Sequence, residues 1–383
     1  MTSIYLDNAS TTKIDPAVVK AMMPYLEEKY GNASSQHLIG QEAKRAIEES
    51  RTIIAKAIGA KYNEIIFTGS GTASNNLLLK GLFFHNKDSG KNHIITTKIE
   101  HDCILNACKW LETQGAKVTY LNVNNQGFIN LKELKNAITP NTLVVSIIHA
   151  NNEIGTIQDL EAIGEICKEK QVYFHTDACQ SFTKVPIDIK QQNLDFVTLN
   201  AHKIHGSKGI GALYVSKELQ NKITPLLHGG GHEFNLRSST ENIPGIVGFA
   251  KAVKIAKNSN IRYQTKLRDK LIKEVLEIPN TNLNGPQENR LCNNINISFN
   301  NIEGEAIGGF LDSYGISSST GSACSSHTLE PSHVLKAIHI PEGIINTSIR
   351  LSVSKFTTQK EIDYTIETLK KVVDKLRKIS PIE

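Results

Sequence analysis

The chain has 383 residues, of which 39% are hydrophobic and 21% charged, and its formal net charge is +5. This balance is typical of a soluble globular protein with two domains, and it gives no reason to expect nucleic-acid binding. The longest apolar runs, such as residues 143–148, are too short to span a bilayer. The first residues show no secretory signal, so we expect a cytoplasmic enzyme.

The first strong pattern predicts a helix within residues 32–59. Ser34 or Ser35 can cap its start, and Gly59 can end it. Its apolar face contains Ala43, Ala46, Ile47, Ile54 and Ile58.

Short apolar segments then alternate with amphipathic ones, which predicts a mostly parallel sheet covered on both faces. The predicted strands lie within residues 64–69, 93–101, 117–123, 142–150, 171–178, 195–201 and 211–215. Residues 250–277 are predicted to form one long connecting helix. Beyond it, strands at 293–299 and 348–354 and an amphipathic helix at 359–378 indicate a smaller α+β unit, with a boundary near residue 255.

The six cysteines show no CxxC motif and no paired spacing typical of metal ligands, so we expect no metal site. Five of them, at positions 103, 108, 167, 179 and 292, lie in or beside apolar or helical segments and are expected to be buried small hydrophobic residues. Cys324 is the exception, because it lies in the serine-rich stretch SSSTGSACSSHT.

Polar residues gather after the predicted strands, where open parallel sheets bind ligands. They are the turn GSGTASNN at 69–76, His101, the turn NNEIG at 151–155, Asp177 with Gln180, and His202 with Lys203. Each alone also fits an ordinary turn or surface residue. Together they are what a pyridoxal phosphate enzyme needs: a lysine for the Schiff base, a carboxylate for the pyridine nitrogen, and a helix start for the phosphate.

At this point the chain resembles the cysteine desulfurases with a long cysteine loop, a group of the class V aminotransferase superfamily. The matching motifs are YLDNASTT, YGNASSQH, FTGSGTASNN, EH at 100–101, HANNEIGTIQ, HTDACQS, NAHKIHGSKGIGALYV, GGGHEFNLRSSTEN, GSACSS, LEPSHVL and SIRLS. The resemblance implies an α/β protein of the PLP-dependent transferase fold type I, with a mostly parallel seven-stranded sheet in a large domain. That domain would span residues 15–255, and residues 1–14 and 256–383 would form the small domain with the cysteine loop at about 317–330.

The resemblance also implies roles for single residues. Lys203 would form the Schiff base with pyridoxal 5'-phosphate, and His101 would stack on the ring and assist proton transfers. Arg350 would bind the carboxylate of the substrate, and Thr240 would reach the phosphate of the other subunit of a homodimer. The remaining cofactor contacts would be Gly71, Thr72, Asn152, Asp177, Gln180, Asn200 and His202, with Asn152 also near the substrate.

Cys324 is similar to the nucleophile that takes the sulfur of L-cysteine, leaving L-alanine and a persulfide. A sulfur-acceptor protein would then take up the persulfide sulfur, either an iron–sulfur scaffold or a component of tRNA thiolation. Selenocysteine lyase is the nearest alternative; a true transaminase and an inactive scaffold protein are others. Several positions depart from the usual family pattern: Asn200 stands where serine is usual, Ala73 where glutamate is, and Ser207 where proline is. The phosphate turn reads GSGT where SGAT is common, and Ser354 and Lys355 replace a usual Gly-Arg.

Overall fold

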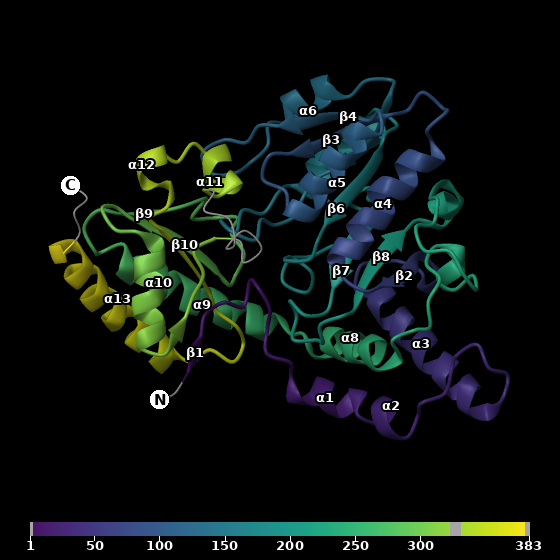
Figure 1. Cartoon of the computed structure of the whole chain (residues 1–383), viewed down its shortest axis with the longest axis horizontal. Helices are drawn as coiled ribbons and strands as arrows, with labels where there is room; N and C mark the ends of the chain where they lie inside the picture. The colour runs from purple at the N-terminus through teal and green to yellow at the C-terminus, as the bar shows by residue number, and fades with distance from the viewer. Residues whose placement is uncertain (1–2, 322–330, 380–383) are drawn as a thin grey trace.

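The computed structural model describes residues 3–321 and 331–379. Two main sheets, each with its own helices, lie side by side (Figure 1). The larger has the strand order β2-β8-β7-β6-β5-β3-β4, and only β8 runs against its neighbours. Its strands are β2 (Ile65–Thr68), β3 (His93–Thr97), β4 (Lys117–Leu121), β5 (Thr142–Ser146), β6 (Tyr173–Asp177), β7 (Phe196–Asn200) and β8 (Gly211–Val215). The predicted mostly parallel seven-stranded sheet is therefore confirmed.

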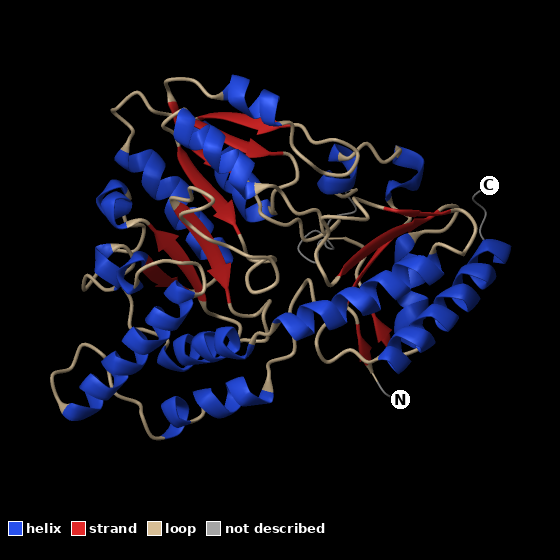
Figure 2. Cartoon of the chain, turned by 180° about the vertical axis from the view of Figure 1, so that it is seen from behind, coloured by secondary structure: helices blue, strands red, loops and turns tan. Residues whose placement is uncertain are grey.

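Helices cover both faces of this sheet (Figures 1 and 2). Because side chains alternate along a strand, Ile66 of β2 packs toward one face while Ile65 and Phe67 pack toward the other. The first face contacts α4 (Gly71–His85) and α5 (Asp102–Thr113). The second carries α1 (Pro16–Met22), α3 (Leu38–Lys56), α6 (Leu131–Ala137), α7 (Leu160–Glu169) and α8 (Ile243–Ile255). Shorter elements of this part are α2 (Pro24–Glu27), η1 (Tyr62–Glu64), η2 (Lys217–Lys222) and η3 (Glu233–Asn235).

The predicted serine cap of the first long helix is wrong. The helix α3 begins at Leu38, and Nδ1 of His37 accepts a hydrogen bond from the Gly40 N–H at 3.2 Å. The serines do not start the helix, because Ser34 is part of a turn before it. In this turn the side chain of Asn32 accepts a hydrogen bond from the Ser34 N–H at 2.8 Å.

The predicted connecting helix at 250–277 is also wrong, since it consists of two helices. Ala256 and Lys257 are extended between α8 and α9 (Asn258–Val275). Packing explains the break, because α8 packs against α1 and α3 beside the larger sheet. The helix α9 packs instead against β10 (Asn294–Phe299) and α13 (Gln359–Ile379), in the second, smaller part of the chain. One straight helix could not bury its apolar residues in both places.

The smaller sheet is antiparallel, with the order β12-β10-β9. Its strands are β9 (Thr281–Leu283), β10 (Asn294–Phe299) and β12 (Ser348–Ser352), and its helices are α9, α10 (Gly304–Ser313), α11 (His333–Ala337), α12 (Glu342–Ile345) and α13 (Gln359–Ile379). The N-terminal β1 (Ile4–Tyr5) pairs in parallel with β11 (Ile316–Ser317). The division into domains at residues 14 and 255 stays a prediction. Cys324, in the predicted loop, lies outside the described residues.

Candidate active site

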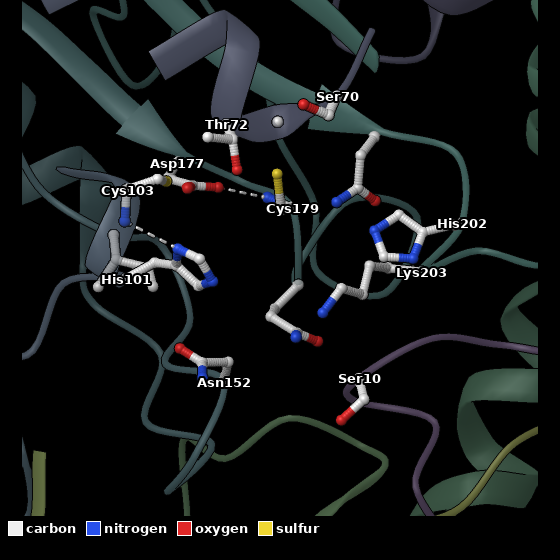
Figure 3. A pocket seen from close by; sticks show the side chains of 14 residues that line it. Ser10, Ser70, Thr72, His101, Cys103, Asn152, Asp177, Cys179, His202 and Lys203 are labelled. Carbon is white, nitrogen blue, oxygen red and sulfur yellow. Dashed lines mark hydrogen bonds between the residues drawn. The ribbon is translucent and has the colours of Figure 1, made fainter. Parts of the chain in front are cut away.

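A cavity of about 190 Å³ opens beyond the carboxyl ends of the central strands (Figure 3). It lies where the strand topology predicts a ligand site, because β7, β6, β5 and β3 are neighbours and parallel. The residues that line it are Ser10, Ser70, Gly71, Thr72, His101, Cys103, Ile148, Asn152, Asp177, Cys179, Gln180, Asn200, His202 and Lys203. Of the predicted site residues that the structure describes, all except Thr240 and Arg350 line this cavity.

Asp177 is the last residue of β6 and is buried. Its Oδ2 accepts from Nδ2 of Asn75 at 2.7 Å, and its Oδ1 accepts from the Cys179 N–H at 2.9 Å. Two donors therefore fix the orientation of the carboxylate at the cavity wall, which suits a partner that carries a positive charge or an N–H. Asn75, buried in α4, belongs to the candidate turn at 69–76, but no role was predicted for this residue.

Lys203 follows β7 and points its amine into the cavity (Figure 3). Its Nζ donates to the carbonyl oxygen of Ala9, and Nε2 of Gln180 donates to the same oxygen at 2.9 Å. The segment around Ala9 belongs to the YLDNASTT motif, for which no role was predicted. It crosses from the smaller sheet to the cavity and holds two of the predicted site residues.

His202 is a neutral imidazole at physiological pH. Burial, followed by the charges of Lys203, Lys208 and Lys184, lowers its pKa to about 4. Its Nδ1 lies 3.2 Å from Oγ1 of Thr11, again in the N-terminal segment. A neutral ring can donate one hydrogen bond to an anion without adding a buried charge.

His101 caps the start of α5, where its Nδ1 accepts from the Cys103 N–H at 3.1 Å. A neutral ring in this arrangement carries its proton on Nε2, and the ring borders the cavity (Figure 3). The preceding residue, Glu100, is buried, and burial raises its pKa to about 8. Its Oε1 accepts from Oγ1 of Thr97 and from the Ile148 N–H.

The start of α4 forms the upper wall of the cavity in Figure 3. Ser70 caps this helix by accepting from the Ala73 N–H at 3.1 Å, and the N–H groups of a first helical turn have no partner within the helix. A Cβ at Gly71 would lie only 2.5 Å from Sγ of Cys179, so glycine leaves the space that this thiol occupies. Oδ1 of Asn200 is buried beside them without a hydrogen-bond partner among the described residues.

Two cysteines differ from the prediction. Cys108, Cys167 and Cys292 are buried, as expected, but Cys103 and Cys179 are partly exposed and line the cavity. Burial, then the nearby Asp177 carboxylate, raises the pKa of the Cys179 thiol well above its usual value, so this thiol stays protonated. The sequence positions of Cys103 and Cys179 could have predicted that both line the site. Cys103 follows His101 by two residues, and Cys179 lies between Asp177 and Gln180.

Arg350 lies in β12, fully buried at the edge of the cavity. It donates to Oδ1 of Asp7 at 2.9 Å, to Oγ of Ser10 at 2.8 Å and to the carbonyl of Asn152 at 3.2 Å. Ser10 and Asn152 both line the cavity, so the guanidinium lies directly behind its wall. Thr240 is exposed and does not line the cavity of its own chain.

This arrangement of a lysine, a carboxylate and a helix start at the end of a parallel sheet defines an enzyme class. The sequence profile described as Aminotransferase class-V matches residues 4–365, and the chain belongs to this family. Within it, the chain is 50% identical to the cysteine desulfurase IscS of Methanosarcina thermophila over 384 aligned positions, covering 99% of this chain and 94% of that protein. The predicted family is thereby confirmed.

Solved structures agree with this assignment. A NifS-like protein has a TM-score of 0.92 and 37% identity, with 98% of this chain and all of that chain covered. SspA, whose structure contains cysteine, has a TM-score of 0.84 and 37% identity over 93% of this chain and 100% of that one. The names of these relatives do not favour the selenocysteine lyase alternative. Among the helices of residues 3–321 and 331–379, none is both long and apolar enough to cross a membrane.

Proposed function

We propose that the protein is a pyridoxal phosphate-dependent cysteine desulfurase that converts L-cysteine to L-alanine. The observation that carries this proposal is the convergence of Lys203, Asp177 and the first turn of α4 on one cavity. In the reaction, the thiolate of Cys324 forms an S–S bond to the sulfur of the substrate while the Cβ–S bond breaks. The carbon takes up a proton, so that alanine and a persulfide on Cys324 are the products.

The residues of the cavity fit the cofactor. The first turn of α4 with Gly71 and Thr72, the neutral His202 and the Nδ2 donor group of Asn200 would hold the phosphate. Asp177 would face the pyridine nitrogen, and Gln180 and Asn152 would contact the ring hydroxyl. Pyridoxal phosphate supplies an electron sink that makes the Cα proton of an amino acid acidic.

The protein groups then have separate tasks. Lys203 provides the amine that binds the cofactor and, once released by the substrate, a base for the Cα proton. His101 holds a proton on Nε2 at the cavity wall. Arg350 binds the carboxylate of L-cysteine, a task that suits a planar guanidinium. Thr240, exposed on its own chain, would contribute to the phosphate site of the partner subunit in a homodimer.

The persulfide sulfur would pass to an acceptor protein in the cytoplasm. An iron–sulfur scaffold is the acceptor we favour, and a tRNA thiolation protein is the second candidate. The name of the Methanosarcina thermophila relative, cysteine desulfurase IscS, supports the sulfur-transfer reaction, and the SspA structure with cysteine supports the substrate.

The test is the stoichiometry of alanine and sulfide formed from L-cysteine by the purified holoenzyme with a thiol reductant. We expect equal amounts of both from the wild type. The Cys324→Ser variant should keep the visible absorbance of the cofactor but form neither product. Alanine formation at the wild-type rate by this variant would refute the role of Cys324, and a keto acid product would point to transamination.

A further inference from the structure

Glu153 is a buried carboxylate one residue beyond Asn152, in the turn that follows β5, and its side chain had no predicted role. Its exposed fraction is 1%. Hydrogen bonds fix the backbone of Glu153 on both sides. On the side of the larger sheet, the Glu153 N–H donates to Oδ1 of Asn151 at 2.8 Å. The carbonyl of Glu153 accepts from Nδ2 of Asn294 at 3.0 Å and from Nδ2 of Asn296 at 3.2 Å. The backbone that carries this carboxylate is therefore fixed by both sheets.

The carboxylate binds one residue, Ser332, and lies near a second, Gly321, which is close to it in sequence. Its Oε2 accepts a hydrogen bond from Oγ of Ser332 at 2.6 Å. A Cβ placed on Gly321 would lie 3.6 Å from the same oxygen. A hydroxyl donating to a carboxylate at this distance makes a charge-assisted bond, roughly twice as strong as a neutral one. The oxygen thus binds Ser332 and lies near Gly321, and Cys324 belongs to the stretch of sequence between these two residues.

Ser332 is itself well placed to fix the chain that follows it. Its Oγ also accepts from the Leu335 N–H at 3.2 Å and so caps α11. Nε2 of His333 lies 2.9 Å from the carbonyl oxygen of Glu100, beside His101. Val334 and Leu335 pack in one apolar cluster with Ile154. One hydroxyl therefore connects the start of α11 to the turn that carries Asn152.

The same turn contacts the groups expected to bind the substrate. The side chain of Asn152 lines the cavity, and its carbonyl accepts from Nη1 of Arg350 at 3.2 Å. Two consecutive residues, Asn152 and Glu153, thus link the cavity wall, the buried arginine and the residues that flank Cys324. A shift of this turn would move all three together.

We propose that Glu153 is a positioning residue for sulfur transfer, which holds Ser332 beside the turn of Asn152 so that Cys324 can reach the sulfur of the substrate. Glu153 does not take part in the chemistry itself. The proposal rests on the proposed function, because the affected step is the attack by Cys324.

The experiment is a single-turnover measurement on the holoenzyme. L-cysteine is added, the reaction is quenched with an alkylating agent, and the persulfide on Cys324 is quantified by mass spectrometry. For Glu153→Ala we expect the rate constant of persulfide formation to fall about tenfold to a hundredfold, as for a misplaced reacting group. The visible absorbance of the cofactor and the concentration of L-cysteine that half-saturates its spectral change should stay within about threefold.

Substitutions of Ser332 separate the anchor from the helix cap. Ser332→Asp keeps an oxygen that can cap α11 but places a second carboxylate against Glu153, so it should slow persulfide formation like Glu153→Ala. Ser332→Thr keeps both the donor and the cap and should restore the wild-type rate. Asn130→Ala, which removes the cap of the distant helix α6, is the matched control and should leave the rate unchanged.

The double variant Glu153→Ala/Ser332→Asp should be no slower than Glu153→Ala, because the aspartate keeps an oxygen for the cap of α11 and meets no second carboxylate. Multiplicative losses, or wild-type rates in Glu153→Ala and Ser332→Asp, would overturn the inference. If Glu153→Ala does not fold, Ser332→Asp against Ser332→Thr decides the question. A wild-type enzyme that forms no persulfide would instead contradict the proposed function, so the two failures are distinguishable.

Discussion

Arg350 and Asp7 form an ion pair of 2.9 Å although 343 positions of sequence separate them. The pair joins β12 to the N-terminal segment at the edge of the cavity. Nε of Arg350 is buried without a hydrogen-bond partner among the described residues, so the guanidinium has capacity for a further acceptor. A substrate carboxylate is the acceptor that the proposed function supplies.

Arg350→Lys should therefore weaken binding of L-cysteine. Lysine keeps the charge but loses the planar fork, so we expect the KM to rise about tenfold or more with a smaller change in kcat. The measurement is alanine formation against L-cysteine concentration, with Arg377→Lys in α13 as the control. An unchanged KM would show that the substrate carboxylate binds elsewhere.

Lys203→Ala should abolish covalent attachment of the cofactor. Borohydride reduction of the wild-type holoenzyme should fix the cofactor on the peptide that contains Lys203, as seen by mass spectrometry, because only an imine is reduced in this way. Lys208→Ala, five positions further and exposed, should behave as the wild type. Labelling of another lysine in the wild type would refute the assignment.

The buried pair of Arg51 and Glu233 should be important for stability. The guanidinium and carboxylate are joined by two bonds of 2.6 and 2.8 Å, and Oε2 of Glu233 also accepts from the Phe67 N–H at 2.7 Å on the free edge of β2. In Glu233→Ala the buried guanidinium of Arg51 and the Phe67 N–H lose their carboxylate acceptor. This loss should lower the unfolding free energy by about 3–5 kcal/mol.

The check is urea unfolding of Glu233→Ala beside Lys135→Ala. Lys135 pairs with Glu169 at 2.8 Å, but both side chains are largely exposed. Loss of such a pair should change the unfolding free energy by less than about 1 kcal/mol. Equal effects of the two variants would contradict the role assigned to burial.

Acid should destabilise the protein through buried histidines. Burial is the main cause that lowers the pKa of His149, His175, His202 and His205 to about 4 each, from 6.5. Between pH 6.5 and 4 the unfolded chain binds protons at these sites and the folded protein does not, so stability falls as the pH falls through this range. Glu100 has the opposite effect, because burial raises its pKa from 4.5 to about 8. Between these pH values the folded protein keeps a proton that the unfolded chain releases. The contribution of Glu100 to the unfolding free energy therefore falls as the pH rises from 4.5 to 8.

His205→Asn isolates one of these histidines. His205 has a φ of +67°, a left-handed conformation that asparagine adopts readily, so the backbone should tolerate the change. The slope of unfolding free energy between pH 4 and 6.5 should decrease by up to about 1.4 kcal/mol per pH unit, which corresponds to one proton. His339→Asn is the matched control, because His339 is exposed and has a φ of +63°. The same slope in wild type and His205→Asn would contradict the prediction.

Much of the fold could be predicted from the residues alone, because it depends on local patterns. Short apolar runs, such as the Leu and two Val within residues 142–146, are buried and form the strands of a covered sheet. The position of His101, Asp177 and Lys203 at or just after the carboxyl ends of parallel strands was enough to predict that they meet, since those strand ends share one edge.

Other features depend on which distant segments pack together, and this packing cannot be predicted from local sequence patterns. Ala9 accepts hydrogen bonds from Gln180 and Lys203, and Asp7 pairs with Arg350, only because the N-terminal segment crosses to the site from β1. The break at Ala256 exists because two separate cores each need a helix. Glu153 looked like part of a polar turn until the tertiary fold placed Ser332, 179 positions further along the chain, against its carboxylate. A buried charge must find its donors in three dimensions, so its role is decided by packing and not by its neighbours in sequence.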